Sequence, residues 1–287
     1  MAETGSYMIP TSIKEVKALG WDYIDVILFT GDAFIDHPSF GTAVIARWLQ
    51  KHGYRVAVVP QPNWRDDLRD FRKLGAPRLY FGVNSGAMDS MVNHYTAAKR
   101  LRSDDAYTPE GKAGQRPDYA VTVYTKILKQ IYPDIPVVIG GIEASLRRVT
   151  HYDYWQDSLK PSILVESGAD WLCYGMGERT MIEFTRAIES GRNLNDIRKI
   201  PQLGFYMDGR CRTKDAVILN SYERCCKDKV AFAENFHVVE TYANMLQPPV
   251  LVEPVGSGYV QINPTWPPAT QEEMDSFWDL PYTKLPH

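Results

Sequence analysis

The stretch DVILFTGDAFIDHPSFG, residues 25–41, joins an apolar run to a polar loop that closes on a glycine. The run 25–30 consists mainly of Val, Ile, Leu and Phe, without alternating polar residues, which is typical of a strand covered on both faces. The loop then presents Asp32, Asp36 and His37. Such a loop is either part of a ligand site or a turn whose aspartates bind turn amides or cap the next helix.

Four more apolar runs follow, and helix-like stretches separate them. The expected strands are 25–30, 55–60, 78–83, 136–141 and 170–175. The expected helices are 42–53, 66–75, 117–133 (with Pro117 in its first turn) and 178–191. Three of these helices end in a glycine, a common stop signal. This alternation predicts an α/β fold with a doubly wound, mainly parallel five-stranded sheet. We expect the flavodoxin-like strand order 2-1-3-4-5, with strand one central.

The pattern of apolar runs and helix-like stretches divides the chain into three parts. These are an N-terminal segment, 1–20, an α/β domain, 21–200, and an α+β extension, 201–287. Within the domain, residues 84–118 form an insertion that is long for a strand–helix connection, and such insertions are often functional. We expect part of it, 88–102, to be helical. In the extension we expect a hairpin around Asp208-Gly209, a long helix over 222–246, and short strands at 250–255 and 259–264.

The composition is ordinary for a globular protein, and we expect the protein to be cytoplasmic. The 287 residues are 44% hydrophobic and 23% charged, with a net charge of −3, so the composition does not favour bulk binding to nucleic acid. No run approaches the roughly 20 apolar residues of a membrane span, and the first twenty residues do not resemble a secretory signal. The four cysteines lack metal-ligand spacing, and we expect them to be reduced thiols.

Polar residues follow each expected strand, and ligands of doubly wound sheets bind beyond the carboxyl ends of the strands. We therefore expect these residues to converge in one crevice that binds a small molecule. The candidates are Asp32, Asp36, His37, Asn84, Asp89, Asn93, His94, Gly140, Gly141, Glu143, Arg147, Arg148, His151, Gly175 and Glu178.

Ordinary structural roles are open to the same residues. The aspartates can serve turns and caps, lone histidines are more often polar edge residues than ligands, and Gly140-Gly141 can simply permit a tight turn. Arg147-Arg148 can be a solvated helix face or can bind an anion. The sequence contains no P-loop, GxGxxG after the first strand, nucleophile elbow or HExxH motif.

Several strings resemble one known family. The strings, in chain order between residues 32 and 287, are DAFIDHPSFG, GAMDSMVNHYTA, DAYTPEGKAGQRPD, VVIGGIEASLRRVTHYDYW, YGMGE and DLPYTKLPH. Together they resemble the amino-terminal region of the YgiQ-like radical SAM proteins. The resemblance implies a cobalamin-binding-like α/β domain that precedes a radical SAM barrel in the same polypeptide. It further implies that the full-length protein binds a [4Fe–4S] cluster and S-adenosylmethionine.

The sequence departs from this family picture at two points. It contains no C-x-x-x-C-x-x-C motif, so no cluster ligand is assigned to this chain, which we interpret as a non-catalytic fragment without a cluster of its own. The base-off cobalamin signature Asp-x-His-x-x-Gly also fails, because Asp36 and His37 are adjacent. Some radical SAM proteins with such a domain bind cobalamin without the histidine, so cobalamin stays possible, but we expect His37 not to ligate cobalt.

Three functional hypotheses remain open. The first is the N-terminal domain of a radical SAM enzyme, which shapes a substrate or cofactor pocket. The second is a stand-alone flavodoxin-like module that binds a corrinoid or an anionic small molecule. The third and weakest is a hydrolase that uses the Asp, His and Glu residues, because no nucleophile is placed beside a base.

Overall fold

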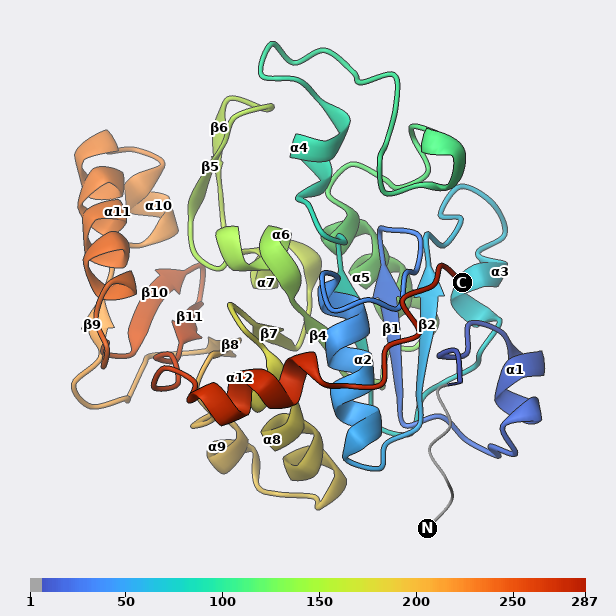
Figure 1. Cartoon of the computed structure of the whole chain (residues 1–287). Helices are drawn as coiled ribbons and strands as arrows, with labels where there is room; N and C mark the ends of the chain where they lie inside the picture. The colour runs from blue at the N-terminus through green and yellow to red at the C-terminus, as the bar shows by residue number, and fades with distance from the viewer. Residues whose placement is uncertain (1–6) are drawn as a thin grey trace.

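One nine-stranded sheet runs through the protein, in a computed structural model that describes residues 7–287 (Figure 1). Residues 1–6 of the predicted N-terminal segment lie outside the described residues. The strand order is β2-β1-β3-β4-β7-β8-β11-β10-β9. These strands are β1 (Val26–Thr30), β2 (Val56–Pro60), β3 (Tyr80–Asn84), β4 (Val137–Ile139), β7 (Trp171–Cys173), β8 (Leu203–Asp208), β9 (Val217–Ile218), β10 (Leu251–Val255) and β11 (Gly258–Ile262).

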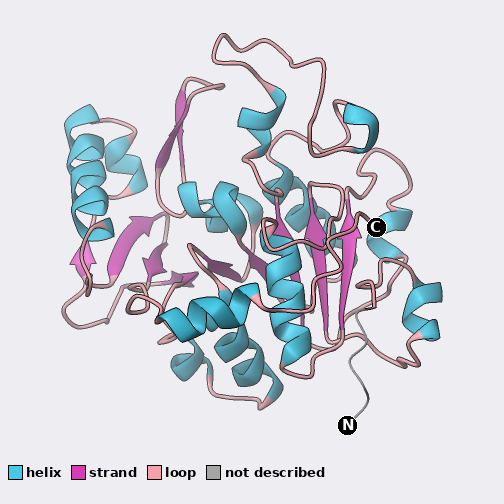
Figure 2. Ribbon diagram, viewed as in Figure 1, coloured by secondary structure: helices cyan, strands magenta, loops and turns pink. Residues whose placement is uncertain are grey.

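Helices surround the sheet, and a small separate hairpin stands beside it (Figure 2). The hairpin is β5 (His151–Asp153) and β6 (Ser158–Lys160). The helices are α1 (Ile13–Ala18), α2 (Gly41–Lys51), α3 (Arg69–Arg72), α4 (Ser90–His94), α5 (Ala120–Ile131), α6 (Gly141–Leu146), α7 (Ile163–Ser167), α8 (Glu178–Glu189), α9 (Leu194–Ile197), α10 (Tyr222–Cys225), α11 (Lys229–Ala243) and α12 (Gln271–Trp278), with a 3₁₀ turn at Pro109–Gly111.

The parallel half of the sheet confirms the predicted fold class and strand order. Strands β2, β1, β3, β4 and β7 lie side by side and parallel, which is the order 2-1-3-4-5. All residues of β1 are buried, as its continuous apolar run requires. The expectation that strand one is central was wrong in detail, because β1 is interior but β3 occupies the middle of the five.

The two faces of this half are covered by different helices, so the sheet is doubly wound. Helices α2 and α8 pack against each other over one face, where the ring of Phe184 meets that of Tyr80 at 5.4 Å. Helices α5 and α7 pack together over the other face, where Phe71 stacks on Phe29 at 5.3 Å. Two apolar cores result, one on each side of the sheet.

Several predicted helices have different bounds for local reasons. Tyr119 adopts a left-handed conformation (φ 52°), so α5 begins at Ala120 and Pro117 lies before it. Leu68 does the same (φ 59°) and shortens the expected helix 66–75 to α3. The helix expected over 88–102 is only α4. The glycine stops are confirmed, because Gly53, Gly75 and Gly191 all have positive φ.

The extension prolongs the sheet with mostly antiparallel strands. Strand β8 pairs antiparallel with β7 and with β11. The two short strands expected at 250–255 and 259–264 are β10 and β11, which form an antiparallel hairpin. The predicted hairpin around Asp208-Gly209 was wrong, because β9 pairs with β10 instead. The long helix expected over 222–246 is divided into α10 and α11, where Asp228 caps α11 by accepting from the Val230 N–H.

The last residues return to the loop after β1. Leu280 and Tyr282 are buried in the core under α2, and Thr283 donates its N–H to Asp36 Oδ2 at 2.9 Å. Ile35 and Pro286 form a β-bridge. The predicted polar loop is thus paired with a segment almost 250 residues away. Within residues 7–287, no helix has both the length and the apolar character needed to cross a membrane.

A buried carboxylate joins the extension to the α/β part. Glu253 on β10 is 1% exposed, and its two carboxylate oxygens accept from the Thr150 N–H at 3.1 and 2.8 Å. Burial raises the pKa of Glu253 from 4.5 to about 7, because the hydrogen bond from Thr150 offsets only part of the lost hydration. The folded state therefore binds a proton that the unfolded chain has already released above about pH 4.5.

We predict that Glu253→Gln flattens the pH dependence of stability. The stability linked to this proton is fully present below about pH 4.5 and is lost as pH rises through about 7, so the wild type loses up to about 3 kcal/mol between these values. Urea unfolding at about pH 5 and about pH 8 should show this loss in the wild type and in Glu110→Gln, an exposed control, but not in Glu253→Gln. Equal losses in all three proteins would contradict the assignment.

Candidate functional site

A crevice of about 310 Å³ opens at the carboxyl ends of β1, β3, β4 and β7, between the N-terminal ends of α2 and α8. It lies where the chain leaves β1 toward one edge of the sheet and β3 toward the other, the position at which doubly wound sheets bind ligands. We call it the glycine crevice. Its glycines are Gly41, Gly82, Gly86, Gly140, Gly141, Gly175 and Gly177.

The missing side chains create this space. Gly141 adopts φ +77° at the start of α6, a conformation that favours glycine, and Gly140 before it is extended. A Cβ atom on Gly140 would lie 3.2 Å from the carbonyl oxygen of Cys173, and one on Gly141 would lie 3.2 Å from Cβ of Asn84. Gly82 of β3 and the glycines just after β4 and β7 therefore line the crevice without side chains of their own.

Asn84 supplies a fixed polar group. Its Oδ1 accepts from Thr30 Oγ1 at 2.9 Å, from Thr42 Oγ1 at 3.2 Å and from the Gly86 N–H at 2.9 Å. These three donors determine the orientation of the amide, so its Nδ2 group is left to donate to a ligand.

Two helix N-termini border the same space. Neither Phe40, the N-cap of α2, nor Gly177, the N-cap of α8, provides a side-chain cap, so the first backbone N–H groups of these helices remain available to an anion. Burial raises the pKa of Glu178, in the first turn of α8. Burial also raises the pKa of the Cys173 thiol to about 12, so that this group stays protonated.

The aspartates of the loop after β1 do not enter the glycine crevice. Asp32 forms an ion pair with Arg116 at 2.8 Å, and the same guanidinium pairs with Asp105 at 3.0 Å and donates to the Ser85 carbonyl at 2.8 Å. Arg116 is 1% exposed. This buried group ties the insertion to the loops after β1 and β3.

The neighbouring loop residues have structural roles as well. Asp36 is fully buried and forms a bidentate pair with Arg47 of α2, at 3.0 and 2.5 Å. His37 takes no part in this pair, and its Nδ1 accepts from the Ser39 N–H at 3.1 Å. The loop 31–41 is therefore largely a turn with paired charges, although Pro38 and Gly41 at its end line the crevice.

Further predicted residues hold α4, α5 and α6 together. Asp89 caps α4 and pairs with Arg147. Glu143 is fully buried and accepts from both the N–H and the hydroxyl of Ser90 and from the Val121 N–H. Arg148 and His151 lie in the segment after α6. Burial, and then the charge of Arg147, lowers the pKa of His151 to about 4, and its Nδ1 lies 3.2 Å from the Val149 carbonyl oxygen.

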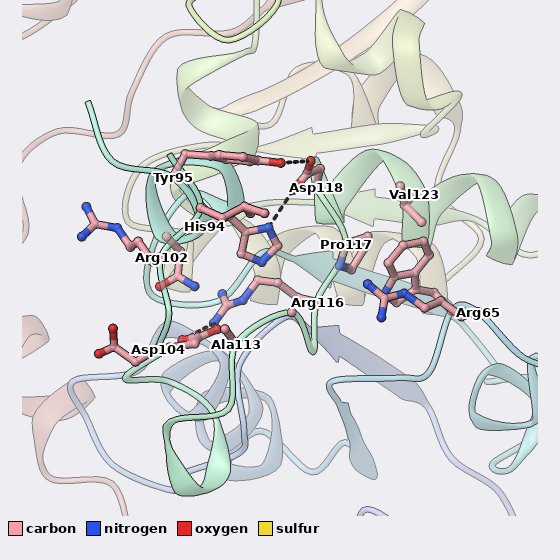
Figure 3. Close-up of a pocket in the computed structure, with 15 residues that line it drawn as sticks. Arg65, His94, Tyr95, Arg102, Asp104, Ala113, Arg116, Pro117, Asp118 and Val123 are labelled. Atoms are coloured by element: carbon pink, nitrogen blue, oxygen red, sulfur yellow. Dashed lines mark hydrogen bonds and ion pairs between the residues drawn. The ribbon is translucent and has the colours of Figure 1, made fainter. Parts of the chain in front are cut away.

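A second hollow, of about 570 Å³, lies under the insertion and contains Asn93 and His94 (Figure 3). We call it the insertion pocket. Its other lining residues are Trp64, Arg65, Tyr95, Leu101, Arg102, Asp104, Asp105, Ala113, Gly114, Arg116, Pro117, Asp118 and Val123.

The predicted residues therefore do not converge in a single crevice. They are distributed over two hollows and several buried contacts. Asn84, Gly140, Gly141, Gly175 and Glu178 line the glycine crevice, Asn93 and His94 line the insertion pocket, and the other eight candidates line neither. The sequence reasoning missed Arg47, Arg116, Asp105 and Asp118. The last three residues lie in the string DAYTPEGKAGQRPD. That string supported the family resemblance, but the sequence alone gave no role to its charged residues.

The radical SAM N-terminal family matches residues 8–287. The chain belongs to this family. UPF0313 proteins of Porphyromonas gingivalis, Bacteroides thetaiotaomicron and Clostridium botulinum are 53%, 52% and 43% identical to it, each over 97% of the chain. The chain covers 44%, 47% and 43% of these relatives, which is less than half their length. The resemblance to the YgiQ-like family is confirmed.

Among solved structures, two of the radical S-adenosylmethionine methyltransferase TsrM from Kitasatospora setae are similar. One holds tryptophan and a SAM analogue, and the other holds cobalamin and a [4Fe–4S] cluster. Each is 21% identical to this chain, with TM-scores of 0.41 and 0.42 over 63% and 64% of the chain and 28% and 27% of TsrM. Likeness at this level transfers no function. In residues 7–287, no three His, Cys, Asp or Glu side chains are grouped so that they could hold a metal ion.

We predict that Arg116→Met lowers the free energy of unfolding by about 3–5 kcal/mol, because it leaves the Asp32 and Asp105 carboxylates buried without a cation. Arg69→Met is the matched control, since Arg69 pairs with Asp67 on the surface, and its effect should stay within about 0.5 kcal/mol. Urea denaturation measures both. If Arg116→Met proved as stable as the control, the insertion would not depend on this pair.

Proposed function

We propose that this chain is the ligand-holding N-terminal domain of a radical SAM enzyme, and that the glycine crevice holds an anionic, nucleotide-like part of a cofactor or substrate. The observation that carries the proposal is the crevice itself. Bare backbone at the ends of β3, β4 and β7, the Asn84 amide and two uncapped helix N-termini converge there. A volume of about 310 Å³ is at the lower end of the range for small-molecule sites.

Membership of the radical SAM N-terminal family supports the first part of the proposal. The relatives are more than twice as long as this chain, and we assign the [4Fe–4S] cluster and S-adenosylmethionine to a radical SAM domain in the remainder of the full-length polypeptide. When bound there, they would supply a 5′-deoxyadenosyl radical. The four cysteines of this chain are not spaced as cluster ligands, so its own contribution is binding and orientation.

The residues of the crevice fit the nucleotide-like tail of a corrinoid better than a histidine-ligated cobalt. A ligating histidine needs a partner that orients its second nitrogen. Asp36, the adjacent carboxylate, is committed to Arg47, and His37 is not among the residues of the crevice. A corrinoid would therefore be held by backbone groups and by Asn84.

The binding test uses hydroxocobalamin and ADP as probes, titrated into the chain by calorimetry. We expect at least one of them to bind with Kd below about 1 mM. Gly140→Val places a side chain in the crevice without requiring a positive φ, and it should weaken binding at least about tenfold. His37→Ala, on the same loop edge but outside the crevice, is the matched control and should bind as the wild type does.

Two results would overturn the proposal. One is the absence of binding by both probes, and the other is a Gly140→Val variant that stays folded, with the urea midpoint of the wild type, and binds normally. The role of His37 is checked separately by electron paramagnetic resonance of the cob(II)alamin complex. Nitrogen superhyperfine splitting that is present in the wild type and lost in His37→Ala would show that His37 ligates cobalt.

A further inference from the structure

The insertion pocket contains a histidine whose ring is held by a carboxylate. His94 is the last residue of α4 and is 9% exposed. Its Nδ1 lies 2.7 Å from Asp118 Oδ1, and the second oxygen of that carboxylate accepts from the Tyr95 hydroxyl at 2.8 Å. Figure 3 shows the ring between Asp118 and Arg116. Since Tyr95 fixes Asp118 and Asp118 fixes His94, the imidazole has one orientation.

This arrangement also selects the tautomer. A carboxylate only accepts hydrogen bonds, so Nδ1 of the neutral ring carries the proton and Nε2 has a free lone pair. Nε2 is buried and has no hydrogen-bond partner within the described chain. Buried polar atoms without a partner are rare, and each calls for an explanation such as a ligand.

A second unpartnered atom lines the same pocket. Arg116 uses its two terminal nitrogens for Asp32, Asp105 and Ser85, but its buried Nε–H has no acceptor within residues 7–287. Two residues that line the pocket therefore each have one buried polar atom without a partner, an acceptor (His94 Nε2) and a donor (Arg116 Nε–H). A hydroxyl group satisfies both at once, because it donates one hydrogen bond and accepts others.

An exposed cation, Arg65, lines the pocket from the segment that precedes α3. The Arg65 guanidinium lies 4.5 Å from the centre of the Trp64 ring, which restricts its position, and it forms no ion pair in the described structure. Arg102 also lines the pocket, but so does Asp104, two positions further along the chain. The acidic neighbours of Arg65 in the chain do not line the pocket, so we assign an anionic group to Arg65. Arginine is well suited to phosphate and carboxylate groups.

We propose that the insertion pocket is a binding site for a small hydroxylated molecule with a phosphate or carboxylate group. The hydroxyl donates to His94 Nε2 and accepts from Arg116 Nε–H, and the anionic group binds Arg65. Asp118 is the residue that positions His94. This site is distinct from the glycine crevice and does not depend on a ligand there.

The first experiment uses the wild-type chain with ¹⁵N-labelled histidine, observed by NMR. We expect His94 to show the Nδ1-protonated tautomer. We then expect its Nε2 resonance to shift on titration with glycerol 3-phosphate, much less with glycerol, which lacks the anion, and much less with inorganic phosphate, which lacks the hydroxyl chain. An Nε2-protonated ring, or a His94 resonance that none of the three probes moves, would overturn the proposal.

Variants then assign the two halves of the ligand. Arg65→Gln and His94→Gln should each weaken binding of glycerol 3-phosphate at least about fivefold, while the exposed controls Arg69→Gln and His237→Gln should leave it unchanged. Gly140→Val, which fills the other hollow, should also leave the His94 shift intact, so that failure of one site is distinguished from failure of the other. Binding that is lost in Gly140→Val but kept in folded Arg65→Gln and His94→Gln would contradict the assignment.

Discussion

The carboxyl edge of the sheet depends on one interaction, the buried pairing of the Arg116 guanidinium with two aspartates. The guanidinium neutralises Asp32 from the loop after β1 and Asp105 from the insertion, and it binds the Ser85 carbonyl after β3. The approach is so close that a Cβ atom on Gly31 would lie 2.2 Å from that carbonyl oxygen. This pairing fixes the later part of the insertion, around Asp105, to the sheet edge, whereas Asp89 and Ser90 fix its beginning through Arg147 and Glu143.

The other buried carboxylates extend the same principle. Asp36 needs Arg47, Asp89 needs Arg147, and Glu143 takes three donors from α4 and α5, because an unpaired buried charge is strongly destabilising. Most charges at the carboxyl edge are therefore used within the fold. The groups that remain for ligands are the less conspicuous ones, namely the Asn84 amide, the bare backbone of the glycines, and Nε2 of His94.

The sequence predicted the parallel half of the sheet well because its signals are local. Each buried strand is one continuous apolar run, and glycine stops such as Gly53 follow directly from backbone sterics. The extension was harder to predict, because β8 pairs with β11, a strand that occurs about fifty residues later, and the turn at Asp208-Gly209 looked sufficient for a hairpin.

The site was predictable in its location but not in its partners. Asn84 ends β3 and Gly140-Gly141 follow β4, and both were placed at the correct edge, as strand order alone requires. The partner of Asp32 lies 84 positions away and that of His94 lies 24 positions away, and no periodicity reveals such pairs. The aspartates of the first loop therefore looked like ligands, although they are structural.

A crystal structure of the chain grown with ADP would test the central claim most directly, namely that the sheet edge binds its ligand at bare backbone rather than at the charged first loop. We predict electron density for the phosphates between the N-termini of α2 and α8, within hydrogen-bond distance of the Asn84 amide. Phosphate density beside His37, or the glycine crevice left empty while ADP is bound elsewhere, would contradict it.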